Sequence, residues 1–223
     1  MRDLLEYLNT MASDNLKKLE FETGLCKLAY KYGTDKCPQI KHSYTPFYYK
    51  YLKHKRNSTK KFMEFGIGHT RKNWHNPKGL SELKLIPNLI SGASLRMWRD
   101  FFPNAQVFGV DISPQTMFTD KRIKTYICDE TKKKAIASLI KKTGNDIDIV
   151  LDDASHHVEH QIGLAKSLLP LLKKDVIYII EDVGHSRDIM KSLGQEYDYF
   201  IPKIPQKWHG EMILVIKNKN YGA

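Results

Sequence analysis

The sequence predicts an α/β fold with a doubly wound sheet, and three observations support this prediction. Short runs rich in β-branched and aromatic residues occur at 61–68, 106–112, 124–128, 147–153, 176–182 and 211–217. Stretches with helical spacing of apolar residues separate several of them, at 94–102, 131–142 and 157–172. Because the runs are nearly all apolar, we expect a parallel sheet that helices cover on both faces.

The region before the first strand has a different pattern. Apolar residues at helical spacing extend from residue 3 to about residue 30. A polar break, "KYGTDKCPQIKHSYTP", follows, and "FYYKYLKH" then predicts a short aromatic helix. We therefore divide the chain into an N-terminal helical segment, 1–58, and an α/β domain, 59–223, within one globular unit.

Composition narrows the class of protein. The 223 residues contain no run of about 18 apolar residues, so no membrane span is expected. The N-terminus is charged throughout and lacks the apolar region of a secretory signal. Cys26, Cys37 and Cys128 show neither metal-site spacing nor an even disulfide set, which favours a reducing, cytoplasmic setting.

The chain carries a formal net charge of +11, which would suit a nucleic acid, a phosphorylated substrate or an acidic glycan. The lysines are spread in small groups, several at the ends of predicted helices, where the helix dipole favours cations. A solvated basic surface is therefore the favoured interpretation, and a nucleic-acid partner is the less favoured one.

Acids and glycines follow the predicted strands. Since the carboxyl ends of parallel strands meet at one edge of the sheet, where such folds bind ligands, we expect these residues to gather there. Polar loops alone would explain one or two cases, and four strand ends with this pattern favour a functional site. The residues are Glu64, Gly66, Gly68, Asp111, Asp152, Asp153, Glu181 and Asp182.

"EFGIG" forms half of a glycine-rich nucleotide loop, because glycine lets the backbone approach a ligand closely. Asp111, at the next strand end, would accept hydrogen bonds from ribose hydroxyls. The sequence separation between Gly68 and Asp111 is about twice the ~20 residues usual between such a loop and its acid. Segment 69–91 is therefore interpreted as an insertion, with Gly92 and Ser94 completing the loop.

Asp129 has two interpretations. It follows the third strand in "CDET" and could accept a hydrogen bond from the exocyclic amine of adenine. It could equally be the N-cap of the helix predicted at 131–142.

The stretch "LDDASHH" and the later "IED" predict the reacting end of the site. Adjacent parallel strands lie about 4.8 Å apart, so Asp153 and Asp182 could share a divalent cation that removes their mutual repulsion. Carboxylate ligands with water favour Mg²⁺. His156, three residues after Asp153, is then suited to act as general base on a hydroxyl.

The neighbouring residues have simpler interpretations. Ser155 is expected to be the N-cap of the following helix. His157, Glu159 and His160 are expected on that helix's surface or at a substrate rim. Asp152 is expected to support the loop or the cofactor.

Five motifs in order resemble class I S-adenosylmethionine (SAM)-dependent methyltransferases of the sugar O-methyltransferase type. The likeness is to the macrolide deoxysugar 2-O-methyltransferases and to cephalosporin-hydroxylase-like relatives, over about residues 31–217. The motifs are "KYGTDK…HSYTPFYYKYL", "FMEFGIG", "GASLRMWRDFFPNAQVFGVDI", "DIVLDDASHHVEHQ" and "YIIEDV".

This resemblance implies a Rossmann-like seven-stranded sheet whose last strand is antiparallel, and a Mg²⁺-dependent methyl transfer from SAM to a sugar hydroxyl. It assigns Asp153 and Asp182 to the metal and His156 to the base. For SAM, it implies a loop of Glu64, Gly66 and Gly68, the ribose on Asp111, adenine near Asp129, the methionine part beside Ser94 and Arg96, and a segment with Tyr44 and Thr45 that closes over the cofactor.

The sequence also departs from these relatives. Ala154 stands where glycine is usual, and the 69–91 insertion replaces a compact glycine-rich run. The large N-terminal domain of the macrolide enzymes has no counterpart in this sequence, so a homo-oligomer stays an open expectation. We expect the substrate rim within 69–91 and 184–210, which contain Trp74, His75, His185, Tyr197, Tyr199, Trp208 and His209.

The expected function is methylation of a hydroxyl on a glycan, a nucleotide sugar or a glycosylated natural product. An RNA ribose 2'-O-methyltransferase would suit the basic charge but leaves the two acidic motifs unexplained. A catalytically silent SAM-fold binding module would not need the acids and His156. The incomplete G-x-G-x-x-G disfavours a nicotinamide oxidoreductase.

Overall fold

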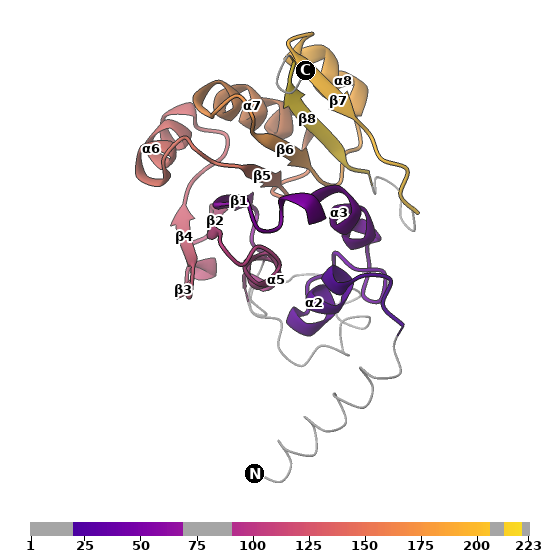
Figure 1. The fold of residues 1–223 in the computed structure, drawn as a ribbon. Coiled ribbons are helices and arrows are strands. Elements are labelled where there is room, and N and C mark those ends of the chain that lie inside the picture. Colours follow the sequence, from indigo (N-terminus) through magenta and orange to yellow (C-terminus); the bar gives the residue numbers. More distant parts are fainter. Residues whose placement is uncertain (1–19, 69–90, 206–211, 220–223) are drawn as a thin grey trace.

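The computed structural model describes residues 20–68, 91–205 and 212–219, and its centre is a sheet of eight strands (Figure 1). Their order across the sheet is β3-β4-β2-β1-β5-β6-β8-β7. The strands are β1 (Lys61–Phe65), β2 (Gln106–Asp111), β3 (Thr119–Asp120), β4 (Ile123–Ile127), β5 (Ile149–Asp152), β6 (Ile177–Ile180), β7 (Tyr197–Phe200) and β8 (Leu214–Asn218).

The sheet confirms the predicted doubly wound topology. β4, β2, β1, β5 and β6 pair in parallel, whereas β8 runs antiparallel to both β6 and β7. The seven longer strands thus form the predicted sheet with an antiparallel last strand. The eighth strand is β3, a two-residue strand that pairs antiparallel with β4 at the edge.

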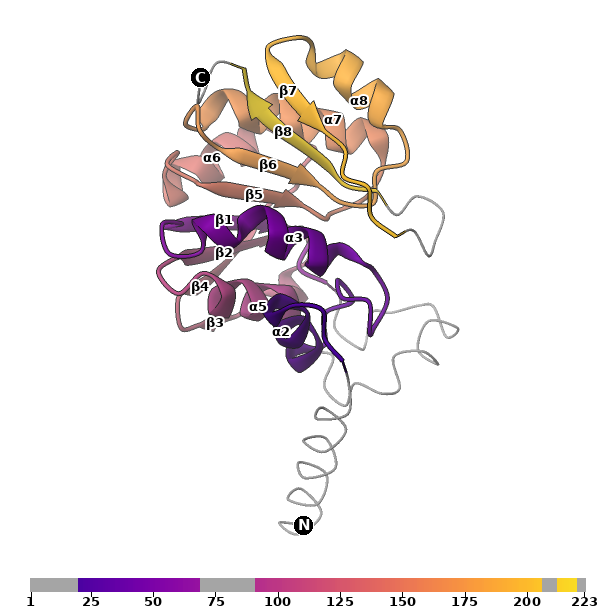
Figure 2. The same ribbon diagram turned by 45° about the vertical axis from the view of Figure 1, so that its right-hand side comes forward.

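Helices cover both faces of the sheet (Figures 1 and 2). One side holds α2 (Gly24–Tyr32), α3 (Tyr44–Leu52) and α5 (Ala93–Phe101). The other holds α6 (Lys133–Thr143), α7 (Val158–Leu168) and α8 (Ser186–Leu193). Side chains alternate between the two faces along a strand, and so Phe62 joins one hydrophobic cluster and Met63 the other.

Local sequence explains several helix ends. The Thr23 hydroxyl accepts a hydrogen bond from the Cys26 amide at the start of α2, and Gly33 ends that helix in the left-handed region. α7 is shorter than the predicted 157–172, because Pro170 falls within a 3-10 turn at Leu169–Leu171.

The N-terminal segment is part of the main core. Leu25 of α2 and both Tyr44 and Tyr48 of α3 are fully buried in the same cluster as Trp98 of α5. The helix expected from residue 3 lies mostly outside the described residues. The sequence did not predict α8, which has only eight residues. It did not predict β7 either, because exposed and half-buried residues alternate along that strand.

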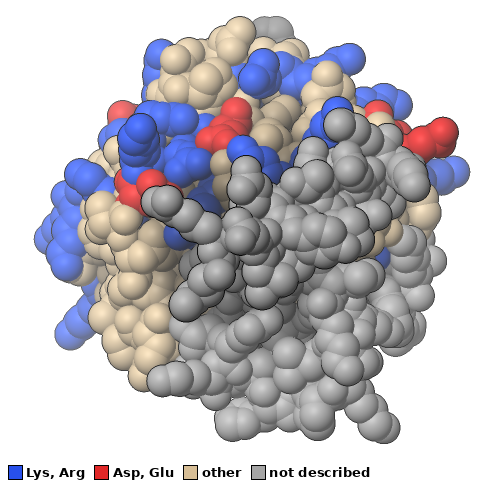
Figure 3. Space-filling view, turned by 90° about the horizontal axis from the view of Figure 1, so that it is seen from below, with Lys and Arg blue, Asp and Glu red and all other residues tan. Residues whose placement is uncertain are grey.

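The face seen in Figure 3 agrees with a dispersed distribution of basic charge. On the face seen in Figure 3, the described Lys and Arg side chains lie in several groups, with acidic side chains among them. None of the helices in the described residues is long and apolar enough to cross a membrane.

Candidate active site

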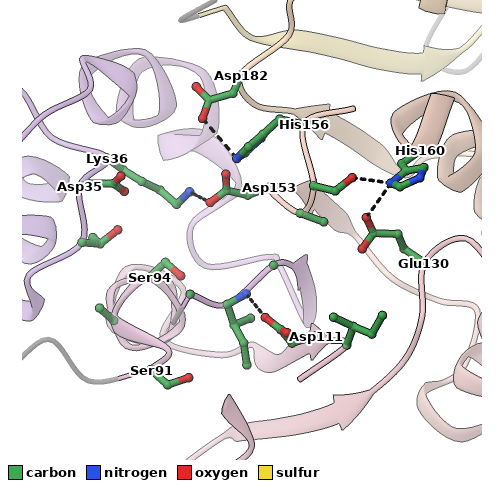
Figure 4. Close-up of a pocket in the computed structure, with 18 of the residues that line it drawn as sticks. Asp35, Lys36, Ser91, Ser94, Asp111, Glu130, Asp153, His156, His160 and Asp182 are labelled. Carbon is green, nitrogen blue, oxygen red and sulfur yellow. Dashed lines mark hydrogen bonds and ion pairs between the residues drawn. The ribbon is translucent and has the colours of Figure 1, made fainter. Parts of the chain in front are cut away.

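A cavity of about 540 Å³ lies at the carboxyl edge of the sheet, where the acids were expected to gather (Figure 4). Its lining comes from the loops after β1, β2, β4, β5 and β6, and from the segment between α2 and α3. The expected residues in its lining are Gly66, Gly68, Ser94, Asp111, Asp129, Asp153, His156 and Asp182.

The glycine loop after β1 forms one wall. Gly66 has a φ of 79°, and a Cβ atom there would lie 2.0 Å from the Asp153 carbonyl oxygen. Gly68 has a φ of 88°, and no described atom lies within 4 Å of the position its Cβ would take. The loop therefore packs tightly on the backbone just after β5 at Gly66 and presents bare backbone to the cavity at Gly68.

Asp111 is held by the loops on either side of it. Its carboxylate accepts hydrogen bonds from the Ile67 amide at 3.1 Å and from the Ser113 amide at 2.8 Å. These bonds hold the carboxylate in place next to the glycine loop. The sequence predicts that this carboxylate binds a ribose.

Asp129 and His160 line the far end of the cavity. The Asp129 carboxylate accepts from the Thr131 amide and hydroxyl, and these bonds lower the Asp129 pKa. The N-cap of α6 is Lys132, so the N-cap interpretation of Asp129 is wrong. His160, expected on a helix surface or a rim, has its Nδ1 2.8 Å from the Ser155 hydroxyl and 4.0 Å from a Glu130 oxygen.

Ser155 is not the N-cap of α7. The N-cap of α7 is His157, which makes no side-chain capping hydrogen bond. Ser155 lies two residues earlier, and the backbone between them passes through the left-handed region at His156. Ser155 instead fixes the His160 ring against the cavity wall.

Asp153, His156 and Asp182 converge at the near end of the cavity. Their possible ligand atoms all lie within 4.8 Å of one another, and His156 Nε2 is 3.7 Å from Asp182 Oδ2 (Figure 4). His156 and Asp182 have φ angles of 58° and 51°, which side chains larger than glycine rarely adopt. Strained backbone of this kind is concentrated at functional sites. Here the two strained residues, His156 and Asp182, point their side chains toward each other.

Lys36 is the main residue that the sequence analysis missed. Its buried ammonium lies 2.5 Å from Asp153 Oδ2 and 3.6 Å from Glu64 Oε1, and it also donates to Glu181. The repulsion expected between carboxylates is thus relieved in part by a lysine. Burial raises the pKa of Asp153, and Lys36 opposes that shift.

The aromatic helix α3 supplies two more partners. The Tyr44 hydroxyl donates to Asp182, and the Tyr48 hydroxyl donates to Glu181 at 2.6 Å. Glu181, expected along the ligand edge, is 1% exposed and faces these interior partners. Thr45 is buried and bonded to the Cys26 thiol, and neither Tyr44 nor Thr45 belongs to the cavity lining.

Three further predicted residues lie behind the cavity wall. Glu64 is fully buried and accepts from Ser94 Oγ at 2.8 Å, and burial raises the Glu64 pKa to about 7. Asp152 is buried against the Tyr178 hydroxyl, and burial raises its pKa to about 7. Arg96 points to Asp120 and Phe118 and to the Ser91 carbonyl, so it supports the start of α5 from outside the cavity.

The substrate rim receives little support from the described residues. Tyr199 donates to the Gly194 carbonyl and packs, with Tyr197, against a hydrophobic cluster, and neither residue lines the cavity. His185 pairs with Asp188 on the surface. Trp74, His75, Trp208 and His209 lie outside the described residues, whereas Ser91, at the end of the 69–91 segment, lines the cavity.

Comparisons with known proteins find relatives in sequence and in fold. No protein-family model matches the chain. The 8-demethyl-8-alpha-L-rhamnosyl tetracenomycin-C 2'-O-methyltransferase of Streptomyces olivaceus is 30% identical over 163 residues, which are 73% of this chain and 38% of the relative. The mycinamicin VI 2''-O-methyltransferase of Micromonospora griseorubida is 30% identical over 159 residues, 71% of this chain and 36% of the relative.

Solved structures show the same fold. MycE methyltransferase from the mycinamycin biosynthetic pathway, in complex with Mg, SAH and mycinamycin VI, superposes with a TM-score of 0.67 at 21% identity, covering 90% of this chain and 56% of that one. The SAH-bound methyltransferase PaMTH1 of Podospora anserina gives a TM-score of 0.56 at 12% identity and covers 96% of both chains.

The chain has the class I methyltransferase fold. Within that class, its sequence is similar to O-methyltransferases that act on sugars of glycosylated natural products, which confirms the resemblance seen in the five motifs. The chain spans little more than a third of the length of those curated relatives.

Proposed function

We propose that this chain is a SAM-dependent O-methyltransferase that methylates a sugar hydroxyl with the help of a divalent cation. The observation that carries the proposal is the convergence of Asp153, His156 and Asp182 at one end of the cavity. The glycine loop and Asp111 line the same cavity.

The residues present fit SAM. Gly68 leaves bare backbone against the cavity, and Asp111 and Asp129 offer carboxylate oxygens to the ribose and to the adenine amine. Ser94 lines the wall beside the glycine loop, where the methionine part is expected. The relatives support this assignment, since the MycE structures hold SAH.

The donor set also fits a hard divalent cation. Asp153 and Asp182 provide carboxylate oxygens, the ligands that Mg²⁺ prefers, and His156 lies beside them without being needed as a ligand. The MycE structures hold Mg. When bound, Mg²⁺ would supply positive charge that favours the ionised form of the acceptor hydroxyl.

The chain's own residues then have distinct roles. His156 takes the proton of the acceptor hydroxyl on a ring nitrogen, because its side chain is 43% exposed and borders the cavity beside Asp182. Asp182 and Tyr44 orient that ring and its surroundings. The transfer forms an oxygen–carbon bond on the sugar and breaks the sulfonium–carbon bond of SAM.

A screen tests the proposal directly. The protein is incubated with SAM and a panel of nucleotide sugars, glycans and glycosylated natural products, with and without EDTA, and SAH formation is measured. We expect turnover with at least one sugar, loss of turnover on chelation and recovery with Mg²⁺. Turnover that survives EDTA would refute the metal role.

Two variants complete the test. His156→Ala should lower turnover by about 10²–10⁴-fold, the range for loss of a general base. Asp153→Ala should lower turnover strongly as well, because it removes a proposed cation ligand, and SAH binding should stay measurable by calorimetry in both variants. Near-wild-type turnover in both variants would refute the assignment of these residues.

We also propose that the protein acts in the cytoplasm. Cys26, Cys37 and Cys128 are all buried free thiols, which suits a reducing compartment. Fractionation of the source cells with an antibody to the chain tests this placement.

A further inference from the structure

Lys36 is a buried cation among the acids of three strands. Its side chain is 2% exposed, and its ammonium contacts Glu64 of β1, Asp153 after β5 and Glu181 after β6. Figure 4 shows the side chain reaching Asp153 from the segment between α2 and α3. One ammonium therefore joins three strand ends to the N-terminal segment.

The three acids differ in their freedom to move. Glu64 and Glu181 have side chains 0% and 1% exposed, whereas the Asp153 side chain is 22% exposed and lines the cavity. Glu64 is also held by Ser94, and Glu181 by Tyr48. Within the described ranges, the Asp153 carboxylate has its only hydrogen bond from Lys36, at Oδ2.

Lys36 holds these acids without a second cation among the described residues. In the part of the chain that the structure describes, no other lysine or arginine forms an ion pair with Glu64, Asp153 or Glu181. Without the Lys36 charge, the three carboxylates would repel one another in a region with little water. Asp153 is the acid that can respond by turning toward the cavity or toward solvent.

We propose that Lys36 is a positioning residue for the proposed metal site. It fixes the Asp153 carboxylate beside Asp182 and His156, so that the two carboxylates can hold a divalent cation next to the base. This inference rests on the proposed metal-dependent function. It assigns to the "KYGTDK" motif a role in cation binding, exerted through Asp153.

Two other roles would give different results. A lysine that only stabilises the fold would leave the cation affinity of a folded variant unchanged. A lysine that competes with the cation for Asp153 would, when removed, raise the affinity. The direction of the change in cation affinity therefore separates the three possibilities.

The experiment measures Mn²⁺ binding in the absence of SAM and substrate, from the electron paramagnetic resonance signal of free Mn²⁺. The variants are Lys36→Met and the charge-balanced double variant Lys36→Met/Glu64→Gln, with Glu64→Gln as its reference. Glu64→Gln removes one buried charge, and Glu64 Oε1 has no hydrogen-bond partner that would be lost among the described residues. The double variant keeps the test available if Lys36→Met does not fold.

Lys41→Met is the matched control. Lys41 also lines the cavity, but its side chain is 45% exposed and its ion pair is with Asp35. We expect Lys41→Met to bind Mn²⁺ within twofold of the wild type. Thermal melts of all variants report whether each is folded.

We expect the double variant to bind Mn²⁺ at least tenfold more weakly than Glu64→Gln, with a cooperative melt. A folded double variant that binds within twofold of its reference, or more tightly, overturns the role of Lys36 and leaves the proposed function intact. A wild-type protein that binds no Mn²⁺ overturns the metal part of the proposed function, and this inference with it.

Discussion

The two edges of the sheet use the same chemical groups for different purposes. At the amino edge, Asp148 accepts from the Lys60 and Lys61 amides and pairs with Lys173 at 2.5 Å. At the carboxyl edge, Lys36 is the lysine that contacts three carboxylates in the described ranges, and Asp182 has a tyrosine and a histidine beside it. At the amino edge a lysine and two backbone amides hold one carboxylate, whereas at the carboxyl edge one lysine contacts three carboxylates.

The difference shows how a structural carboxylate is distinguished from a functional one. The Lys173 ammonium and two amides satisfy Asp148 against the cost of its partial burial, and its pKa is lowered. Burial raises the pKa values of Asp153, Glu64 and Glu181 despite Lys36. An excess of buried negative charge destabilises the fold unless a ligand offsets it, and this favours a cation-binding role for the carboxyl edge.

The strongest test of this comparison exchanges the same atom at each edge. Asp182→Asn should lower turnover by about 10³-fold, because a neutral amide binds the cation more weakly than a carboxylate does. The bound cation would contribute several kcal/mol of transition-state stabilisation. Asp148→Asn, the matched control, should keep turnover within about twofold at 25 °C. Initial rates with the sugar found in the screen provide the measurement, and equal losses in both variants would break the comparison.

The unfolding free energy should respond more strongly to a substitution at the amino edge than to one at the carboxyl edge. Asp148→Asn should lose about 2 kcal/mol at pH 7, since a charge-assisted hydrogen-bonding hub is weakened. Because the Asp148 pKa is lowered in the folded protein, this contribution is lost as the pH falls below about 4. Urea titrations at pH 7 and pH 3 should therefore show a smaller difference between variant and wild type at pH 3.

Glu64 should give a pH dependence of the opposite sign. Its pKa of about 7 in the folded protein means that unfolding releases a proton between about pH 4.5 and 7, so stability falls as the pH rises through this window. Glu64→Gln should reduce that fall by an amount on the order of 1 kcal/mol. Urea titrations of the ligand-free protein at pH 5, 6 and 7 measure it, and an unchanged slope would contradict the assigned pKa.

The smallest effect is expected at the far end of the cavity. Asp129 is half-buried and already bonded to Thr131, so Asp129→Asn should weaken SAH binding by only about threefold, which corresponds to an exposed hydrogen bond. Calorimetric titration with SAH measures this change. A loss of a hundredfold would show that Asp129 carries the nucleoside end of the site.

Much of the fold was predictable because its signals are local. The apolar runs predicted six of the strands within a few residues, and the acids at the ends of β2 and β5 predicted the ligand edge. Asp111 and Asp129 are held by bonds to residues close to them or in the adjoining loop, so their placement followed from the strand pattern. The edge strand β7 gave no such signal, because its side chains alternate around partial exposure.

The sequence by itself determined the doubly wound sheet and the side of it on which Asp153, His156 and Asp182 lie, because periodicity and strand ends depend on neighbouring residues. Only the tertiary structure showed that Lys36 and Tyr44 reach Asp153 and Asp182 from more than a hundred residues away. Such partners depend on how the loop after α2 crosses the sheet edge. No spacing within the chain encodes that crossing. The crossing brings the positive charge of Lys36 among the carboxylates of the site.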